Sequence, residues 1–138
     1  MGKVFYISCF FLLTCCCSFA YAQDKPLVDS LETLLNTYTP ERNVATDTTR
    51  VHLLNKLSFE YRNSNPEKTK NYAEEALALS KKIGFKKGIA RSLNIIAIVY
   101  KNQENYDKAI DHFLRYLKIK EKLGDKQAIA RGLNRLGN

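Results

Sequence analysis

The stretch IARSLNIIAIVY, residues 89–100, decides the fold, because its opening returns 40 positions later as IARGLNRLGN, residues 129–138. A further copy lies upstream, where LNKLSFEY, residues 54–61, parallels LNIIAIVY, residues 93–100, at an offset of 39. Self-similarity at a fixed period of this length is typical of proteins built from repeated units. We therefore expect a first repeat at 49–88, a second at 89–128 and the start of a third, truncated repeat at 129–138.

Each repeat is predicted to contain two helices. In the second repeat, apolar residues at three- and four-residue spacing predict a first helix at about Ile89–Lys101. A second helix is expected to begin near Asp107, an acid that suits the positive end of a helix, and to end at Gly124. The spacing of its apolar residues predicts that this helix buries Ala109, Ile110, Phe113, Leu114, Leu117 and Leu123.

The first repeat contains the same signals. Asn65-Pro66-Glu67 combines an N-cap residue, a proline at the first helical position and an acid in the first turn. The helix that follows is predicted to end at Gly84. It is expected to pack through Tyr72, Ala73, Ala76, Leu77 and Ile83.

Residues 23–48 precede the repeats. Apolar residues predict a short amphipathic helix at about Pro26–Thr37, through Leu27, Leu31, Leu34 and Leu35. The polar stretch after this helix is interpreted as a connector. We expect this helix to cap the exposed side of the first repeat.

The repeat pattern resembles the tetratricopeptide repeat, whose signature is a large residue, two spaces, Leu-Gly, two spaces, Tyr, and then Ala-x-x-x-Phe. The matching positions of the three copies are Leu54, Leu57, Ser58 and Tyr61; Leu93, Ile96, Ala97, Tyr100, Ala109 and Phe113; and Leu133, Leu136 and Gly137. The resemblance implies an all-α fold, an α-solenoid of antiparallel helix pairs wound as a right-handed superhelix. Stacking is physically reasonable, because a two-helix unit cannot bury its apolar face alone.

The resemblance also implies a peptide-binding groove lined by the first helix of each repeat. The groove candidates are His52, Asn55, Phe59 and Arg62; Arg91, Asn94, Ile98 and Lys101; and Arg131, Asn134 and Arg135. An asparagine side chain both donates and accepts hydrogen bonds, so the recurring asparagines could bind a peptide backbone. They could equally bridge adjacent helices. The arginines favour acidic peptides as partners.

No catalytic constellation stands out in the sequence. There is no glycine-rich phosphate loop, no paired-cysteine zinc spacing and no Ser-His-Asp arrangement. His52 and His112 are interpreted as ordinary helix histidines. We therefore expect neither an enzyme in this segment nor a cofactor or metal site.

Residues 1–22 are predicted to be a secretory signal peptide. Val4–Ala20 is uncharged and nearly all apolar, Lys3 precedes it, and Ala20-Tyr21-Ala22 offers a cleavage site, with Ala20 and Ala22 as the small residues. All four cysteines lie in this apolar run, so they are interpreted as small apolar residues. We expect a protein exported to the periplasm or another extracytoplasmic space, attached to a membrane only if the signal is retained or an anchor follows.

The basic charge, formally +8, fits acidic proteins or anionic surfaces better than nucleic acid once export is expected. Two functional hypotheses follow. The first is a non-enzymatic scaffold that binds proteins or peptides. The alternative is the extracytoplasmic sensory region of a larger membrane signalling protein, a sensor histidine kinase or cyclase. The exposed end repeat also provides a surface for self-association.

Overall fold

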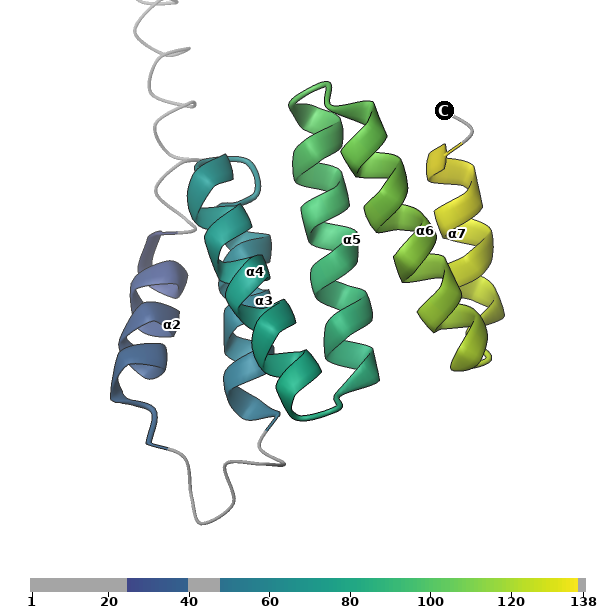
Figure 1. Cartoon of the computed structure of the whole chain (residues 1–138). Coiled ribbons are helices and arrows are strands. Elements are labelled where there is room, and N and C mark those ends of the chain that lie inside the picture. Colours follow the sequence, from purple (N-terminus) through teal and green to yellow (C-terminus); the bar gives the residue numbers. More distant parts are fainter. Residues whose placement is uncertain (1–24, 40–47, 137–138) are drawn as a thin grey trace, which may run out of the picture.

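The structure is a computed structural model that describes residues 25–39 and 48–136. The predicted signal peptide, its cleavage site and the four cysteines lie outside these ranges. Within them the chain forms helices and no strand (Figure 1). In chain order the helices are α2 (Lys25–Thr37), α3 (Thr49–Tyr61), α4 (Pro66–Lys82), α5 (Lys86–Asn102), α6 (Tyr106–Lys122) and α7 (Lys126–Leu136).

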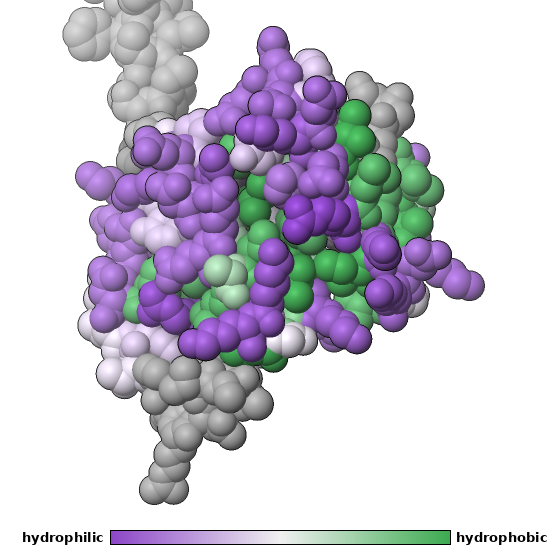
Figure 2. Space-filling model, viewed as in Figure 1, coloured by the Kyte–Doolittle hydropathy of each residue, from purple (hydrophilic) through white to green (hydrophobic). Residues whose placement is uncertain are grey.

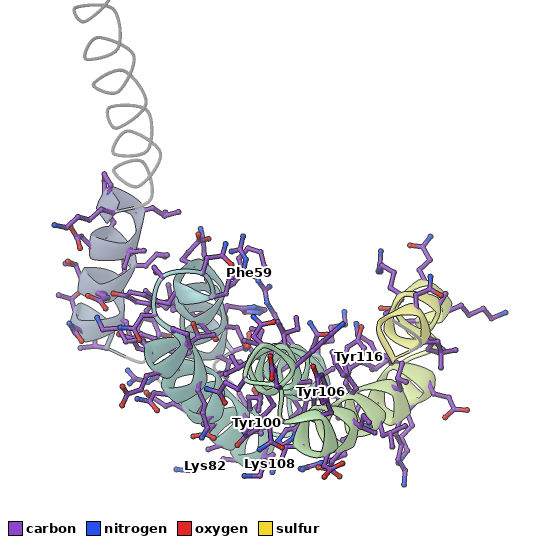
Figure 3. The ribbon with its side chains drawn as sticks, turned by 90° about the horizontal axis from the view of Figure 1, so that it is seen from above. Phe59, Lys82, Tyr100, Tyr106, Lys108 and Tyr116 are labelled. Carbon is purple, nitrogen blue, oxygen red and sulfur yellow. The ribbon has the colours of Figure 1, made fainter. Side chains whose placement is uncertain are left out.

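The helices pack in sequence order, each against the next, which confirms the predicted all-α solenoid. We call α3, α5 and α7 the A helices, and α4 and α6 the B helices. The A helix α3 also contacts α5, whereas α4 and α6 have no close backbone approach. The stack therefore curves. Figure 3 shows an arc with the A helices along its inner side and the B helices along its outer side.

Side-chain caps begin both B helices. Asn65 Oδ1 accepts a hydrogen bond from the Lys68 amide at 2.9 Å, and Pro66 occupies the first helical position. The equivalent residue of the second repeat, Asn105, accepts from the Lys108 amide at 3.4 Å. The predicted cap at Asn65 is thus confirmed. Each such bond satisfies one of the free amides at a helix start.

Glycines end both B helices as predicted. Gly84 and Gly124 each have φ of +70°, a left-handed conformation that suits glycine. The first helix of the second repeat, however, begins at Lys86 and not at Ile89. Residues 86–88 form its first turn, and the Ile89 amide donates to the Phe85 carbonyl at 3.0 Å.

Gly88 lies in this first turn and faces both α3 and α4. A Cβ atom at Gly88 would lie 2.8 Å from Val51 Cγ1, 2.5 Å from Ser80 Oγ and 2.5 Å from Phe85 Cδ1. The absence of a side chain therefore lets the first turn of α5 approach both α3 and α4. The interior of the stack is closed at this point by a backbone contact rather than by a large side chain.

The core forms two clusters, one between α2, α3 and α4 and one between α4, α5, α6 and α7. Most residues of the repeat signature lie in this interior. The buried ones are Leu54, Leu57, Ser58, Leu93, Ile96, Ala97, Ala109 and Phe113, while Tyr61 and Tyr100 are half-buried. Leu133 differs, because 55% of it is exposed. The structure does not describe the Leu136 side chain or Gly137.

The burial expected for several α6 residues is wrong. Ile110, Leu114 and Leu123 are 46%, 54% and 36% exposed. The buried line of α6 runs through Ala109, Phe113 and Tyr116. Ile110 and Leu114 each follow a buried residue by one position, which rotates them by about 100° away from the core.

Helix α2 packs on α3 through Val28, Leu31 and Leu35. Two leucines that were expected to pack, Leu27 and Leu34, are 40% and 54% exposed. They lie on the outer side of this short helix. Glu32, on the same helix, makes polar contacts in addition to this packing.

The Glu32 carboxylate joins α2 to the first repeat. Its Oε1 atom accepts hydrogen bonds from Tyr61 Oη at 2.7 Å, from Tyr72 Oη at 3.0 Å and from Lys68 Nζ at 3.1 Å. The Tyr61 and Tyr72 rings stack with centroids 5.9 Å apart. A carboxylate on α2 thereby draws α3 and α4 together at one point.

These contacts alter the acidity of all four groups. The hydrogen bond from Tyr61 is the main cause that lowers the pKa of Glu32. Burial, followed by the bond to Glu32, raises the pKa of Tyr72 to about 12. Burial also raises the pKa of Tyr61, and hydrogen bonds to Tyr61 and Glu32 raise that of Lys68. The charged pair of Glu32 and Lys68 is therefore favoured in the folded protein.

Candidate functional site

The exposed side chains of the A helices form the candidate site, which we call the A face. On α3 its first members are His52 and Phe59, both exposed. Phe59 is 45% exposed and lies on the inner side of the arc (Figure 3). It is supported by Arg62, whose guanidinium carbon lies 3.7 Å from the ring centroid. Arg62 Nη1 also donates to the Phe59 carbonyl at 2.7 Å, so a cation is fixed beside an accessible aromatic ring.

His52 makes an edge-to-face contact with the ring of Phe85, at 5.3 Å between centroids and 70° between planes. Phe85 directly precedes α5. The contact therefore places His52 where two successive A helices meet. Its ring is held by packing and stays accessible on one side.

Helix α5 contributes four predicted residues to the A face. Arg91 is exposed, while Asn94, Ile98 and Lys101 are half-buried. Ile98 packs against the core cluster of the second repeat. Arg91 is thus the most accessible of the four.

Asn55 does not belong to the A face, although its position in the repeat suggested it. It is 1% exposed. Its Nδ2 atom donates to the Val51 carbonyl at 3.1 Å, and its Oδ1 atom accepts from Ser92 Oγ at 3.0 Å. Of the two roles considered for the asparagines, Asn55 therefore has the structural one: it bridges α3 and α5. Asn94 differs, since its side chain is half-buried.

On α7, Arg131 and Asn134 are exposed. Arg131 and Arg91 occupy the same position in successive repeats, and His52 is the equivalent residue of α3. Arg135 lies in α7, and the structure does not describe its side chain. A basic residue or histidine thus recurs at one position of every A helix.

Two exposed lysines that were not among the predicted groove residues lie close to them on the A helices. Lys56 lies between His52 and Phe59 at spacings of four and three, so it shares their side of α3. Lys87 lies one turn before Arg91 on α5. The helical spacing from His52 and Arg91 could have identified both.

Charge is distributed unevenly between the two sets of helices. Helices α5 and α7 contain no acidic residue, and α3 contains only Glu60. The B helices carry acids throughout, namely Glu67, Glu74 and Glu75 on α4 and Asp107, Asp111 and Glu121 on α6. Helices α5 and α7 are therefore strongly basic, whereas α3 and the B helices carry charges of both signs.

The outer side has a different arrangement of cations. The ring of Tyr100 lies near the ammonium groups of Lys70 and Lys108, at 5.4 Å and 5.3 Å from the centroid, and near the ring of His112 at 5.4 Å. Lys70 and His112 lie close to carboxylates, Glu74 and Asp111, each at 3.8 Å. The charge of Lys70 is therefore partly balanced by a carboxylate.

Within residues 25–39 and 48–136, no group of three or more His, Cys, Asp or Glu side chains is placed to hold a metal ion. None of the helices in these ranges has the length and apolarity that a membrane crossing needs.

Comparison with protein families gave one match. The model described as tetratricopeptide repeat matches residues 50–122, which comprise nearly all of α3 and the whole of α4, α5 and α6. Comparison with curated proteins and with solved structures found no match.

Proposed function

The chain belongs to the tetratricopeptide repeat family, and we propose that it is a non-enzymatic interaction scaffold whose A face binds acidic peptide segments. Repeats of this family generally mediate protein–protein interactions. The finer assignment, an acidic partner on this face, is the proposal.

The uneven charge of the helices is the observation that carries the proposal. The A helices carry one acid, Glu60. Their exposed cations include Lys56, Lys87, Arg91 and Arg131. A surface of one sign raises the local concentration of partners of the opposite sign and speeds their association. Acidic segments are therefore the partners that this face attracts.

Phe59 and Arg62 supply a local anchor on the same face. An exposed aromatic ring beside a guanidinium offers an apolar contact and a bidentate partner for a carboxylate in one place. Aromatic and arginine side chains carry much of the binding energy in protein interfaces. We expect an acidic segment that also contains an apolar residue to bind best.

We further propose that the protein is exported. The support is the apolar run Val4–Ala20 with Lys3 before it and Ala20-Tyr21-Ala22 after it. Expression of the whole chain followed by fractionation and mass spectrometry of the N-terminus tests this. A product that begins at Gln23 outside the cytoplasm supports export, and an intact N-terminus in the cytoplasm contradicts it.

The binding proposal can be tested with a library of fluorescent acidic peptides and two charge-matched variants. One variant reverses two A-face cations, Lys56→Glu with Arg91→Glu. The control reverses two outer-side cations, Lys82→Glu with Lys108→Glu (Figure 3). The two variants have the same net charge, so only the location of the change differs.

The A-face variant should lose at least about tenfold in affinity, and added salt should weaken binding to the unmodified chain. The control variant should bind like the unmodified chain. Equal losses in both variants would show that only net charge matters. Unchanged binding in both would exclude the A face.

A further inference from the structure

Helix α6 carries an exposed apolar line that the repeat packing does not use. Tyr106, Ile110 and Leu114 are 57%, 46% and 54% exposed and follow one another at four-residue spacing. Figure 2 shows hydrophobic surface gathered toward the α6 and α7 side of the molecule. The buried side of α6 is a separate line, through Ala109, Phe113 and Tyr116.

Comparison with the first repeat shows that stacking uses only the middle of this line. The equivalent residues of α4 are Pro66, Lys70 and Glu74. Pro66 and Glu74 are exposed and Lys70 is half-buried, although a further repeat is stacked on α4. Tyr106 and Leu114 therefore stand where a stacked repeat leaves polar residues at the surface, whereas Lys70, the equivalent of Ile110, lies with its ammonium 5.4 Å from the centroid of the Tyr100 ring of α5.

A stripe of charge runs beside the apolar line. Its residues are spaced by four, four, three and four, so they share one side of the helix, and all are exposed: Asp107, Asp111, Arg115, Lys118 and Lys122. The acids occupy the first half of the helix and the bases the second half. The equivalent positions of α4, which are Glu67, Asn71, Glu75, Ala78 and Lys82, lack this division.

We propose that two copies of this chain associate by packing α6 against α6 in antiparallel orientation about a two-fold axis. With the axis passing between His112 and Phe113, Ile110 of each copy faces Leu114 of the other. Asp107 then lies near Lys118 of the second copy, and Asp111 near Arg115 of the second copy. Symmetry makes each of these pairs twice, as in other isologous interfaces.

The division of charge identifies the second copy as the occupant. An acidic or basic peptide would match one half of the stripe and repel the other half. An antiparallel second copy matches both halves and covers the apolar line at the same time. In the single chain, Asp111 pairs with Arg115 of the same helix at 3.3 Å. The Asp111 side chain is 62% exposed and the Arg115 side chain is 46% exposed. They can therefore exchange this pair for an equivalent one between copies.

This interface uses the B helix α6, and the proposed peptide site uses the A helices. The two proposals can therefore fail independently. A variant that loses self-association but binds peptides as before would show that only the α6 interface is disrupted.

The test uses the whole chain and sedimentation equilibrium. The unmodified chain should form dimers, and Leu114→Glu should raise the dissociation constant by about 100-fold or more. Leu133→Glu is the matched control, since Leu133 is an equally exposed leucine on α7, and it should leave the dimer intact. A monomeric unmodified chain, or a dimer that survives Leu114→Glu, would overturn the proposal.

A charge exchange tests the antiparallel register without disturbing the apolar line. One variant carries Asp107→Lys and Asp111→Lys, and the other carries Arg115→Asp and Lys118→Asp. Each alone should be monomeric, because like charges face each other, and an equimolar mixture should form heterodimers. Circular dichroism checks that both variants are helical. Variants that dimerise alone, or a mixture that stays monomeric, would contradict the register.

Discussion

Ser92 of α5 donates a hydrogen bond to Asn55 of α3 across 3.0 Å, and both side chains are almost completely buried. The Asn55 amide also donates to the Val51 carbonyl, so the bridge joins two A helices and the backbone of one of them. Polar groups in the interior need such partners, because a buried donor or acceptor without one is costly.

Replacement of Asn55 by Ala should therefore lower the free energy of unfolding by about 1–3 kcal/mol, from the lost bridge and the space left behind, while the Ser92 hydroxyl keeps the Gly88 carbonyl as an acceptor at 3.1 Å. Asn71→Ala, at an exposed position of α4, should change it by less than about 0.5 kcal/mol. Urea unfolding measures both. If Asn55→Ala is as mild as the control, the bridge contributes nothing to the stack.

The Glu32 cluster predicts a dependence of stability on pH. The pKa of Glu32 is lower in the folded chain, so the folded state favours the carboxylate. Its contribution is present above the pKa of the unfolded chain and is lost as the pH falls through the lower, folded value. The pKa of Tyr72 is raised to about 12, so its contribution is lost as the pH rises from about 10 toward that value.

Glu32→Gln should reduce stability at neutral pH by about 1–2 kcal/mol and flatten the loss on the acid side. Thermal melts over a series of pH values measure both effects. Asp29→Asn, at an exposed position of the same helix, is the control and should leave the pH profile unchanged. An unaltered acid limb in Glu32→Gln would show that another group causes it.

At Gly88 we predict that replacement by alanine destabilises the protein, which is the opposite of its usual effect within a helix. Glycine to alanine within a helix ordinarily stabilises it by about 1 kcal/mol. At Gly88 the added methyl would meet the buried Val51 and Ser80, so Gly88→Ala should destabilise by about 1–3 kcal/mol.

Gly132→Ala on α7 is the comparison for this prediction. There the nearest contact is the flexible end of Leu117, which can move aside. The change should be neutral or slightly stabilising. Denaturant midpoints of the two variants decide the matter, and a stabilising Gly88→Ala would show that α5 can move outward at no cost.

Leu93 and Leu133 occupy the same position in successive repeats but are 1% and 55% exposed. Helix α6 packs against α5, and the structure describes no equivalent helix after α7. Leu93→Ala should cost about 2–5 kcal/mol, whereas Leu133→Ala should cost less than about 0.5 kcal/mol. Similar losses in chemical unfolding would contradict the exposure of Leu133.

The sequence predicted the helix pairs because repetition and apolar spacing are local properties of the chain. Asn65, Gly84 and Gly124 act through their own neighbours in sequence, so their roles as helix start and ends could be predicted. The close packing at Gly88 could not, because it depends on Val51, a residue of another helix.

Burial was harder to predict for the same reason. Ile110 and Leu114 are as apolar as Phe113, and only the position of α5 decides which of them is covered. The position of Asn55 in the repeat allowed either an exposed or a bridging role, and Ser92 decides between them. The contacts of Glu32 reach residues 29, 36 and 40 positions away, for which no periodic signal exists.

The uneven distribution of charge between A and B helices has a kinetic consequence. It gives the electric dipole of the molecule a component that points across the stack, toward the A helices. A protein with such a dipole is rotated by the field of an approaching anionic partner before the two touch. Encounters then occur preferentially with the inner side of the arc turned toward the partner, so a larger share of collisions leads to binding.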